Sequence, residues 1–131
     1  MSYLPPAAGT FTPTVTVAGG TVPTYTTNTG RYTRVGNRVV VEVLLTGNGG
    51  TPGSGGTSFT IALPFTASAS SPAGIFPCGA YRNNSMNMGC FGEINGAVAV
   101  VTLTDGTFML MTGDDQNATD RQIRLQFAYE V

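Results

Sequence analysis

The segment Arg38–Thr46 restricts the possible folds of this chain more than any other part of the sequence. Successive side chains of an extended strand point to opposite faces, so this segment would place its residues on two faces. The two sets are Val39, Val41, Val43 and Leu45 on one face, and Val40, Glu42 and Leu44 on the other. A run that is apolar on nearly both faces is typical of a strand covered on both sides. The two covers are either the core and a neighbouring subunit, or the two layers of a thick sandwich.

The rest of the sequence also indicates strands, because Thr and Val recur in short runs that Gly and Pro interrupt. The chain has 131 residues, of which 18 are Gly and 8 are Pro. Besides the central run, the expected strands are Thr14–Ala18, Val22–Thr27, Arg31–Val35, Thr57–Leu63, Ile75–Arg82, Gly96–Thr104, Thr107–Thr112 and Ile123–Val131. Because no segment has a convincing helical pattern, we predict an all-β fold, an antiparallel β-sandwich of about 8 strands.

Short segments rich in Gly and Asn are expected to connect these strands. Asn28-Thr29-Gly30 and Gly36-Asn37 are predicted turns, and Asp105-Gly106 is a residue pair that type I′ hairpins prefer. The Gly-rich stretch 47–56 is predicted to be a flexible loop. Pro77 cannot donate a ladder hydrogen bond, so it indicates an edge strand or a bulge.

The ends of the chain differ in character from its middle. Residues 1–12, which include Pro5, Pro6 and Gly9, are predicted to form an extended N-terminal arm outside the sheet. Residues 13–131 are predicted to form a single β-sandwich domain. The N-terminus has neither the basic nor the apolar part of a secretory signal, and no apolar stretch approaches the roughly 20 residues of a membrane-spanning helix. We therefore expect folding in the cytoplasm of the producing cell, without a membrane partner.

The charged side chains exclude several classes of function. The chain has no His, and its 6 basic residues are all Arg. Without His there is no Ser-His-Asp or Cys-His nucleophile, and without Lys there is neither Schiff-base chemistry nor a P-loop lysine. A formal net charge of -1 disfavours binding of nucleic acid through its phosphates. What remains is a protein that is not an enzyme, which we favour, or an enzyme that works with a few carboxylates. We expect no cofactor and no nucleic-acid partner.

Cys78 and Cys90 lie in a Gly- and Asn-rich segment that could bring them together. A protein made in the cytoplasm usually keeps its thiols reduced, so free thiols are the favoured interpretation. A disulfide remains the alternative. A zinc site is disfavoured, because two cysteines without His are an incomplete ligand set.

Carboxylates near the C-terminus are candidate ligands and catalysts. Asp114, Asp115 and Asp120 could supply oxygen ligands for Ca²⁺. Adjacent side chains of an extended chain point apart, however, so a solvated loop is the favoured interpretation. Glu93 and one of these residues could form the carboxylate pair of a glycosidase, but nothing in their spacing supports that role. We therefore predict no catalytic and no metal-binding residue.

Aromatic and basic side chains near the expected turns are candidate binding residues. The aromatic candidates for stacking on sugar rings are Tyr25, Tyr32, Tyr81 and Phe91. Packing in the core or against a subunit is the favoured role of Tyr32, since the chain lacks Trp, the strongest sugar platform. Arg31, Arg34 and Arg38 surround one expected hairpin. They could bind an acidic sugar or form ion pairs between subunits, and a solvated strand face is the favoured alternative.

A sequence pattern covering most of the chain resembles a known family. Gly9–Val15 opens the pattern, with Phe11 where relatives commonly have Trp. Gly30–Val39, with the form Gly-x-Tyr-x-x-Val-Gly-Asn-x-Val, is its most specific part. Ala62–Phe65 and the final strand Ile123–Val131 complete it. The pattern resembles the small β-sandwich modules of tailed bacteriophages, which occur on tail fibres, on tailspikes and as free-standing virion surface proteins.

This resemblance implies a viral structural protein with a jelly-roll-like sandwich, usually a homotrimer. A capsid decoration, or cement, protein would bind the outer shell and stabilise neighbouring capsomers. A receptor- or glycan-binding protein would instead stand at the tip of a tail fibre or tailspike. We favour the cement role, because the motif begins as early as Gly9 and no shaft or tail-attachment segment precedes it.

The cement role assigns functions to two sets of residues. The arm residues Met1, Ser2, Tyr3, Leu4, Pro5 and Pro6 would contact the major capsid protein. The trimer interface would include Val40, Glu42, Leu44 and Tyr32. The protein would then lie on the capsid surface of the virion after assembly in the host cytoplasm. Under the alternative role, its partner would be a glycan of the host surface.

Overall fold

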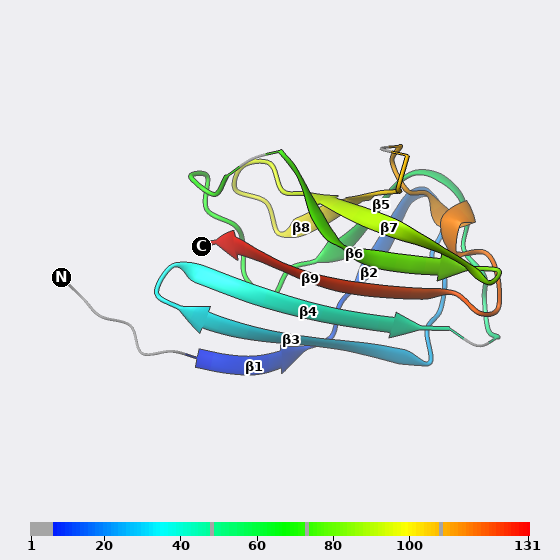
Figure 1. Ribbon diagram of the computed structural model, residues 1–131, viewed down its shortest axis with the longest axis horizontal. Coiled ribbons are helices and arrows are strands. Elements are labelled where there is room, and N and C mark those ends of the chain that lie inside the picture. Colours follow the sequence, from blue (N-terminus) through cyan, green and yellow to red (C-terminus); the bar gives the residue numbers. More distant parts are fainter. Residues whose placement is uncertain (1–6, 48, 73, 108) are drawn as a thin grey trace.

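The computed structural model describes residues 7–47, 49–72, 74–107 and 109–131. The described residues form nine strands and one short 3-10 helix: β1 (Ala7–Phe11), β2 (Val15–Thr21), β3 (Thr27–Val35), β4 (Arg38–Thr46), β5 (Ser54–Ala62), β6 (Ile75–Asn83), β7 (Met86–Glu93), β8 (Val100–Thr104), η1 (Gly113–Gln116) and β9 (Gln122–Glu130). These strands make one antiparallel sheet in the order β1-β3-β4-β9-β6-β7-β8-β5-β2 (Figure 1). The predicted all-β class is confirmed. Among the described residues, no helix has the length and hydropathy to span a membrane.

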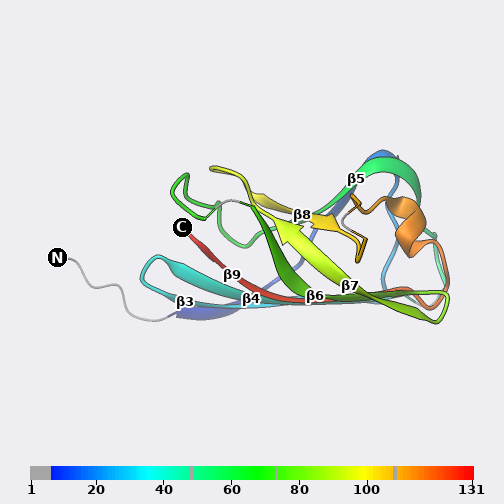
Figure 2. The same cartoon turned by 45° about the horizontal axis from the view of Figure 1, so that its top comes forward.

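The sheet is curled into a half-barrel rather than flat. Its two outermost strands, β1 and β2, follow each other in the chain and are linked by Thr12-Pro13-Thr14 alone. An extended chain spans at most about 3.5 Å per residue, so this link holds the two ends of the sheet within about 14 Å of each other. Figure 2 shows the result, with β8 and β5 lying over the layer that contains β4, β9 and β6.

The core lies inside the curl, and alternation along the strands supplies it. In β4 and β9 the odd-numbered residues are buried, whereas the even-numbered ones are exposed or half-buried. From the other half of the sheet come Val17, Phe59, Ile61, Val101 and Leu103, all buried. The two-faced pattern that the sequence shows at 38–46 therefore corresponds to one face in the core and one face outside.

Part of the segment predicted as an extended N-terminal arm belongs to the sheet. Ala7–Phe11 is not free but forms the edge strand β1, paired along its whole length with β3. Two glycines permit this pairing: a Cβ on Gly9 would lie 2.6 Å from the hydroxyl of Tyr32, and a Cβ on Gly30 would lie 2.5 Å from the Phe11 ring. Gly30 is therefore part of a strand, and the turn predicted at this glycine was wrong. The remaining arm residues, 1–6, lie outside the described residues.

Asp105-Gly106 does not form the predicted two-residue hairpin turn, although the chain does reverse after Thr104 and Leu110 bridges back to it. The carboxylate of Asp105 accepts hydrogen bonds from the backbone N–H and hydroxyl of Thr107 and from the backbone N–H of Met109. Partial burial raises the pKa of Asp105, but these three hydrogen bonds lower it by more. The pKa of Asp105 is therefore below its ordinary value. The chain that follows folds back as a loop, with a single isolated bridge between Thr104 and Leu110, so the strand predicted at 107–112 was wrong.

The strands β6 and β7 form a long hairpin. The strand predicted at 75–82 is confirmed as β6, and the irregularity expected at Pro77 is a bulge between Pro77 and Gly79. The hairpin turns at Asn84 and Ser85, both with positive φ. The strand predicted at Val22–Thr27 was wrong, because 22–26 lies outside any strand. The sequence also did not indicate β7.

Candidate functional site

The side of the sheet turned away from the core is the candidate functional site, and we call it the outer face. It is formed by alternate residues of β3, β4 and β9: Thr29, Arg31, Thr33, Val40, Glu42, Leu44, Arg124 and Gln126. The strand register places Glu42 between Arg31 and Gln126. It likewise places Leu44 between Thr29 and Arg124.

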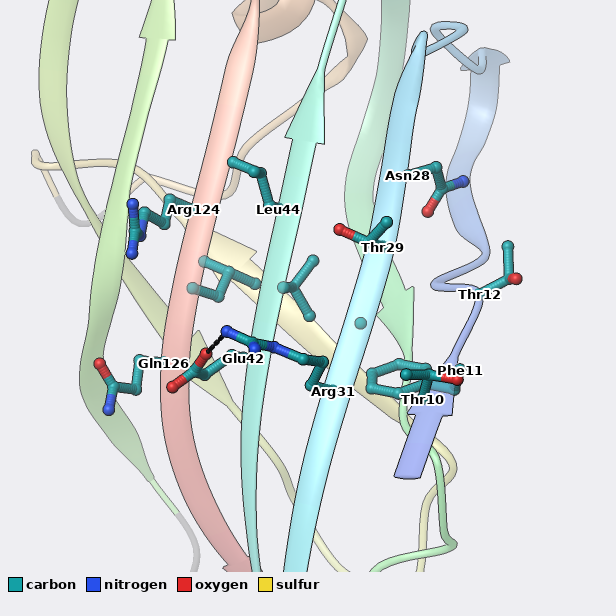
Figure 3. Close-up of a pocket in the computed structure, with 13 residues that line it drawn as sticks. Thr10, Phe11, Thr12, Asn28, Thr29, Arg31, Glu42, Leu44, Arg124 and Gln126 are labelled. Carbon is teal, nitrogen blue, oxygen red and sulfur yellow. Dashed lines mark hydrogen bonds and ion pairs between the residues drawn. The ribbon is translucent and has the colours of Figure 1, made fainter. Parts of the chain in front are cut away.

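A groove of about 680 Å³ runs across this outer face. Its side chains are drawn in Figure 3, which shows Leu44 on β4 with Arg124 on one side of it and Thr29 on the other. Thr10 of the edge strand β1 and Gln126 of β9 also line the groove. The groove thus combines apolar side chains, among them Phe11 and Leu44, with hydroxyl, amide and charged groups.

Its charges are only partly compensated. Arg31 donates a hydrogen bond to Glu42 at 2.8 Å, forming an ion pair with side chains that are 73% and 46% exposed. Such an exposed pair contributes little to stability, typically about 0–1 kcal/mol. Within the described part of the chain Arg124 forms no ion pair, so its guanidinium leaves the groove with a net positive charge.

The structure brings together three of the four residues assigned to a trimer interface. Val40, Glu42 and Leu44 lie in a row on the outer face, each half-buried. Tyr32 lies on the opposite, inner side of β3, where its ring meets Phe65 edge-on with centroids 5.0 Å apart. The arm residues Met1, Ser2, Tyr3, Leu4, Pro5 and Pro6, assigned to capsid contact, lie outside the described residues.

The three arginines around the β3–β4 hairpin do not form a common site. Arg31 belongs to the outer face, but Arg34 lies over the Phe65 ring, 5.3 Å from its centroid. Arg34 also donates a hydrogen bond to the carbonyl of Gly36. Arg38 is exposed at the start of β4. A single anion cannot contact all three guanidinium groups in this arrangement.

The acidic residues near the C-terminus bind backbone amides. Asp114 accepts from the N–H of Gly55, and Asp120 accepts from the N–H groups of Asn84 and Ser85. Asp115 accepts from the N–H of Thr112 at the start of η1, and burial raises its pKa. Across the described ranges, no group of three or more Cys, Asp or Glu side chains is placed to hold a metal ion. These carboxylates cap loops and hairpins.

The aromatic candidates are used mainly for packing. The hydroxyl of Tyr25 donates to the side-chain oxygen of Gln116, and burial raises the pKa of Tyr25 despite the nearby positive charge of Arg121. Tyr81 is buried, with its hydroxyl directed at the sulfur of Met88. Neither ring is free to stack on a sugar.

Sequence reasoning missed one internal residue of unusual chemistry, Arg121. Its side chain is 1% exposed, and its guanidinium donates to the carbonyl oxygens of Thr24, Ala118 and Gly49. It also lies over the ring of Tyr25, 5.7 Å from the centroid. The signal was present, since Arg121 has the same odd numbering as the buried residues of β9. Arg121 therefore connects two loops, those that contain Thr24 and Gly49, to the beginning of β9.

No family model matches this chain, and a search of curated proteins found no match either.

Proposed function

We propose that this chain is a non-enzymatic structural protein of a tailed-bacteriophage virion, a trimeric capsid decoration protein of the jelly-roll-like class. It would bind the outer shell through the major capsid protein and stabilise neighbouring capsomers. The motif that resembles such modules, Gly30–Val39, spans the end of β3, its turn and the start of β4. The proposed role needs no catalytic group and no cofactor.

The observation that carries the proposal is the half-buried outer row of β4. Val40 and Leu44 present apolar surface in the middle of the sheet, with the carboxylate of Glu42 between them. Burial of apolar surface against another copy is favourable by roughly 25 cal/mol per Å². The positive charge of Arg124 next to this row gives a second copy's Glu42 an oppositely charged partner. We leave Tyr32 out of this interface, because its ring packs against Phe65 on the inner side of β3.

The edge strand β1 supports the second half of the proposal. Residues 1–6 continue directly from Ala7, which pairs with Arg34 at the edge of the sheet. A segment that leaves an edge strand can extend onto a neighbouring protein without disturbing the domain that carries it. We assign Met1–Pro6 as the strap that contacts the shell.

Self-association is tested by placing a charge in the outer row. Leu44→Glu is expected to convert a trimer to a monomer, because it replaces an apolar contact with a desolvated carboxylate and engages Arg124, the partner proposed for a second copy's Glu42. Sedimentation equilibrium of the wild type and the variant measures the mass directly. Thr16→Glu, at an exposed position of β2, is the matched control and should remain trimeric. An unchanged trimer in Leu44→Glu, or a wild-type monomer, would contradict the interface.

Shell binding is tested by removing residues 1–6 and leaving β1 intact. The truncated protein is expected to keep its fold and oligomeric state but to lose most of its co-sedimentation with capsids that lack the protein. Circular dichroism and thermal unfolding serve as the control for folding. Undiminished pelleting of the truncated protein would show that the strap is not the contact.

The groove favours one other function, binding of a host-surface glycan by a tail protein. Arg124 offers a guanidinium to a sugar carboxylate, while Gln126 and Thr29 can hydrogen-bond sugar hydroxyls. A glycan array probed with the purified protein separates the two roles. Binding to acidic glycans that Arg124→Ala abolishes would support the tail role, and absence of binding would count against it.

A further inference from the structure

The two cysteines lie opposite each other across the β6–β7 hairpin. At the bulge, Cys78 and Gly79 on β6 together face Cys90 on β7, because the register shifts between Pro77 and Gly79. In a bulge of this kind two residues of one strand oppose one residue of its partner. The two sulfur atoms are 3.9 Å apart.

Both thiols lie in the core. Cys78 is 2% exposed and Cys90 is 1% exposed. The Cys78 thiol donates to the carbonyl oxygen of Cys90 at 3.4 Å, and the sulfur of Cys90 lies 3.9 Å from that of Met111. The pair is therefore held in one arrangement by its surroundings.

We propose that Cys78 and Cys90 are an oxidation site that forms an intrachain disulfide across this hairpin when the protein meets a low-molecular-weight disulfide such as oxidised glutathione. The two sulfur atoms are 3.9 Å apart, whereas a disulfide holds its sulfur atoms about 2.05 Å apart. An approach of about 2 Å between the sulfur atoms, through rotation of the two side chains, would therefore form the bond.

The reaction is a two-step thiol–disulfide exchange. The thiolate of one cysteine attacks a sulfur of oxidised glutathione, which forms a mixed disulfide and releases one glutathione thiolate. The second cysteine, as its thiolate, attacks the protein sulfur of that mixed disulfide and releases the second glutathione. The two protons of Cys78 and Cys90 end on two glutathione thiols. The protein loses two electrons, and oxidised glutathione gains them.

The surroundings of the pair set the speed of this reaction. The hydrogen bond between the cysteines, and then their burial, raises the pKa of Cys78 above its ordinary value, so its thiol is protonated at neutral pH. Only the thiolate attacks a disulfide, and a buried sulfur is reached only when the hairpin opens locally. We expect slow oxidation that accelerates as the pH rises and when a low concentration of urea is added.

The test uses the whole chain. The reduced, folded protein is incubated with oxidised glutathione, remaining thiols are blocked with N-ethylmaleimide in denaturant, and the mass is measured without reductant. The expected product has lost two hydrogens, carries no maleimide, and yields one peptide in which Cys78 is joined to Cys90. Its midpoint of thermal unfolding should rise by roughly 5–10 °C.

Three outcomes would overturn the proposal: two maleimide adducts after prolonged incubation, a stable glutathione adduct, or a disulfide between chains. Cys78→Ser and Cys90→Ser are the matched controls, since each keeps a side chain of similar size but cannot form the bond. Neither control should show the rise in thermal midpoint after oxidation. If either variant fails to fold, the mass and the linked peptide of the wild type are sufficient to test the proposal.

Discussion

Replacement of Arg121 by Ala is expected to lower the free energy of unfolding by about 3–5 kcal/mol. The change removes the donors for the carbonyl oxygens of Thr24, Ala118 and Gly49 and leaves a cavity beneath the ring of Tyr25. A buried acceptor without a partner costs its full desolvation energy, and here several are lost together. Arg121→Lys should be intermediate, because an ammonium group cannot span the same set of acceptors.

Arg82→Ala is the matched control for this prediction. It removes the same side-chain type from an exposed position of β6, outside the row assigned to the trimer interface. Its effect on stability should stay within about 0.5 kcal/mol. Urea unfolding of the wild type and each variant, followed by circular dichroism, measures the difference. Equal losses in the two variants would show that Arg121 does not organise the loops around it.

Gly79→Ala is expected to be the most damaging single methyl addition, at about 3 kcal/mol or more. Gly79 has φ of 153°, which an L side chain rarely adopts. A Cβ at this position would lie 1.9 Å from the carbonyl oxygen of Arg124 on the neighbouring strand. Because that contact is with backbone, relief requires the β6–β9 pairing to move apart.

Gly89→Ala provides the comparison within the same hairpin. A Cβ at Gly89 meets nothing within 4 Å, so the substitution should change the unfolding free energy by no more than about 0.5 kcal/mol. Thermal and urea unfolding of both variants gives the two values. A tolerated Gly79→Ala would mean that the bulge beside Cys78 is not held in place by the packing of β6 on β9.

Strands with regular alternation were predictable from the sequence. The bounds of β4 agree with the expected 38–46, and β9 lies within one residue of its expected position. Alternation is a local property, because neighbouring residues along the strand decide which face is buried. It also divided β9 correctly into a core face and an outer face.

Elements that depend on distant partners were not predictable. β7 contains Gly and Asn and lacks β-branched residues, so only its pairing with β6 and β8 makes it a strand. The edge strand β1 forms because Tyr32 and Phe11 cover glycines on the opposite strand. Asp105-Gly106 resembled a hairpin turn, but the hydrogen bonds of the Asp105 carboxylate favour a wider loop.

The candidate site was predictable only in part, for the same reason. The sequence placed Val40, Glu42 and Leu44 on one face, and the structure has them there. It did not show that Arg124 lies beside Leu44, because β4 and β9 are far apart in the chain and only their register joins them. Tyr32 was grouped with the outer row although its strand position turns it toward the core.

The position of the protein on the virion tests the capsid decoration proposal most directly. Antibody against the purified protein, labelled with gold, can be located on whole phage particles by electron microscopy. The proposal predicts label spread over the outside of the head and absent from the tail. Label confined to the tail tip or fibres would contradict it and favour the receptor role.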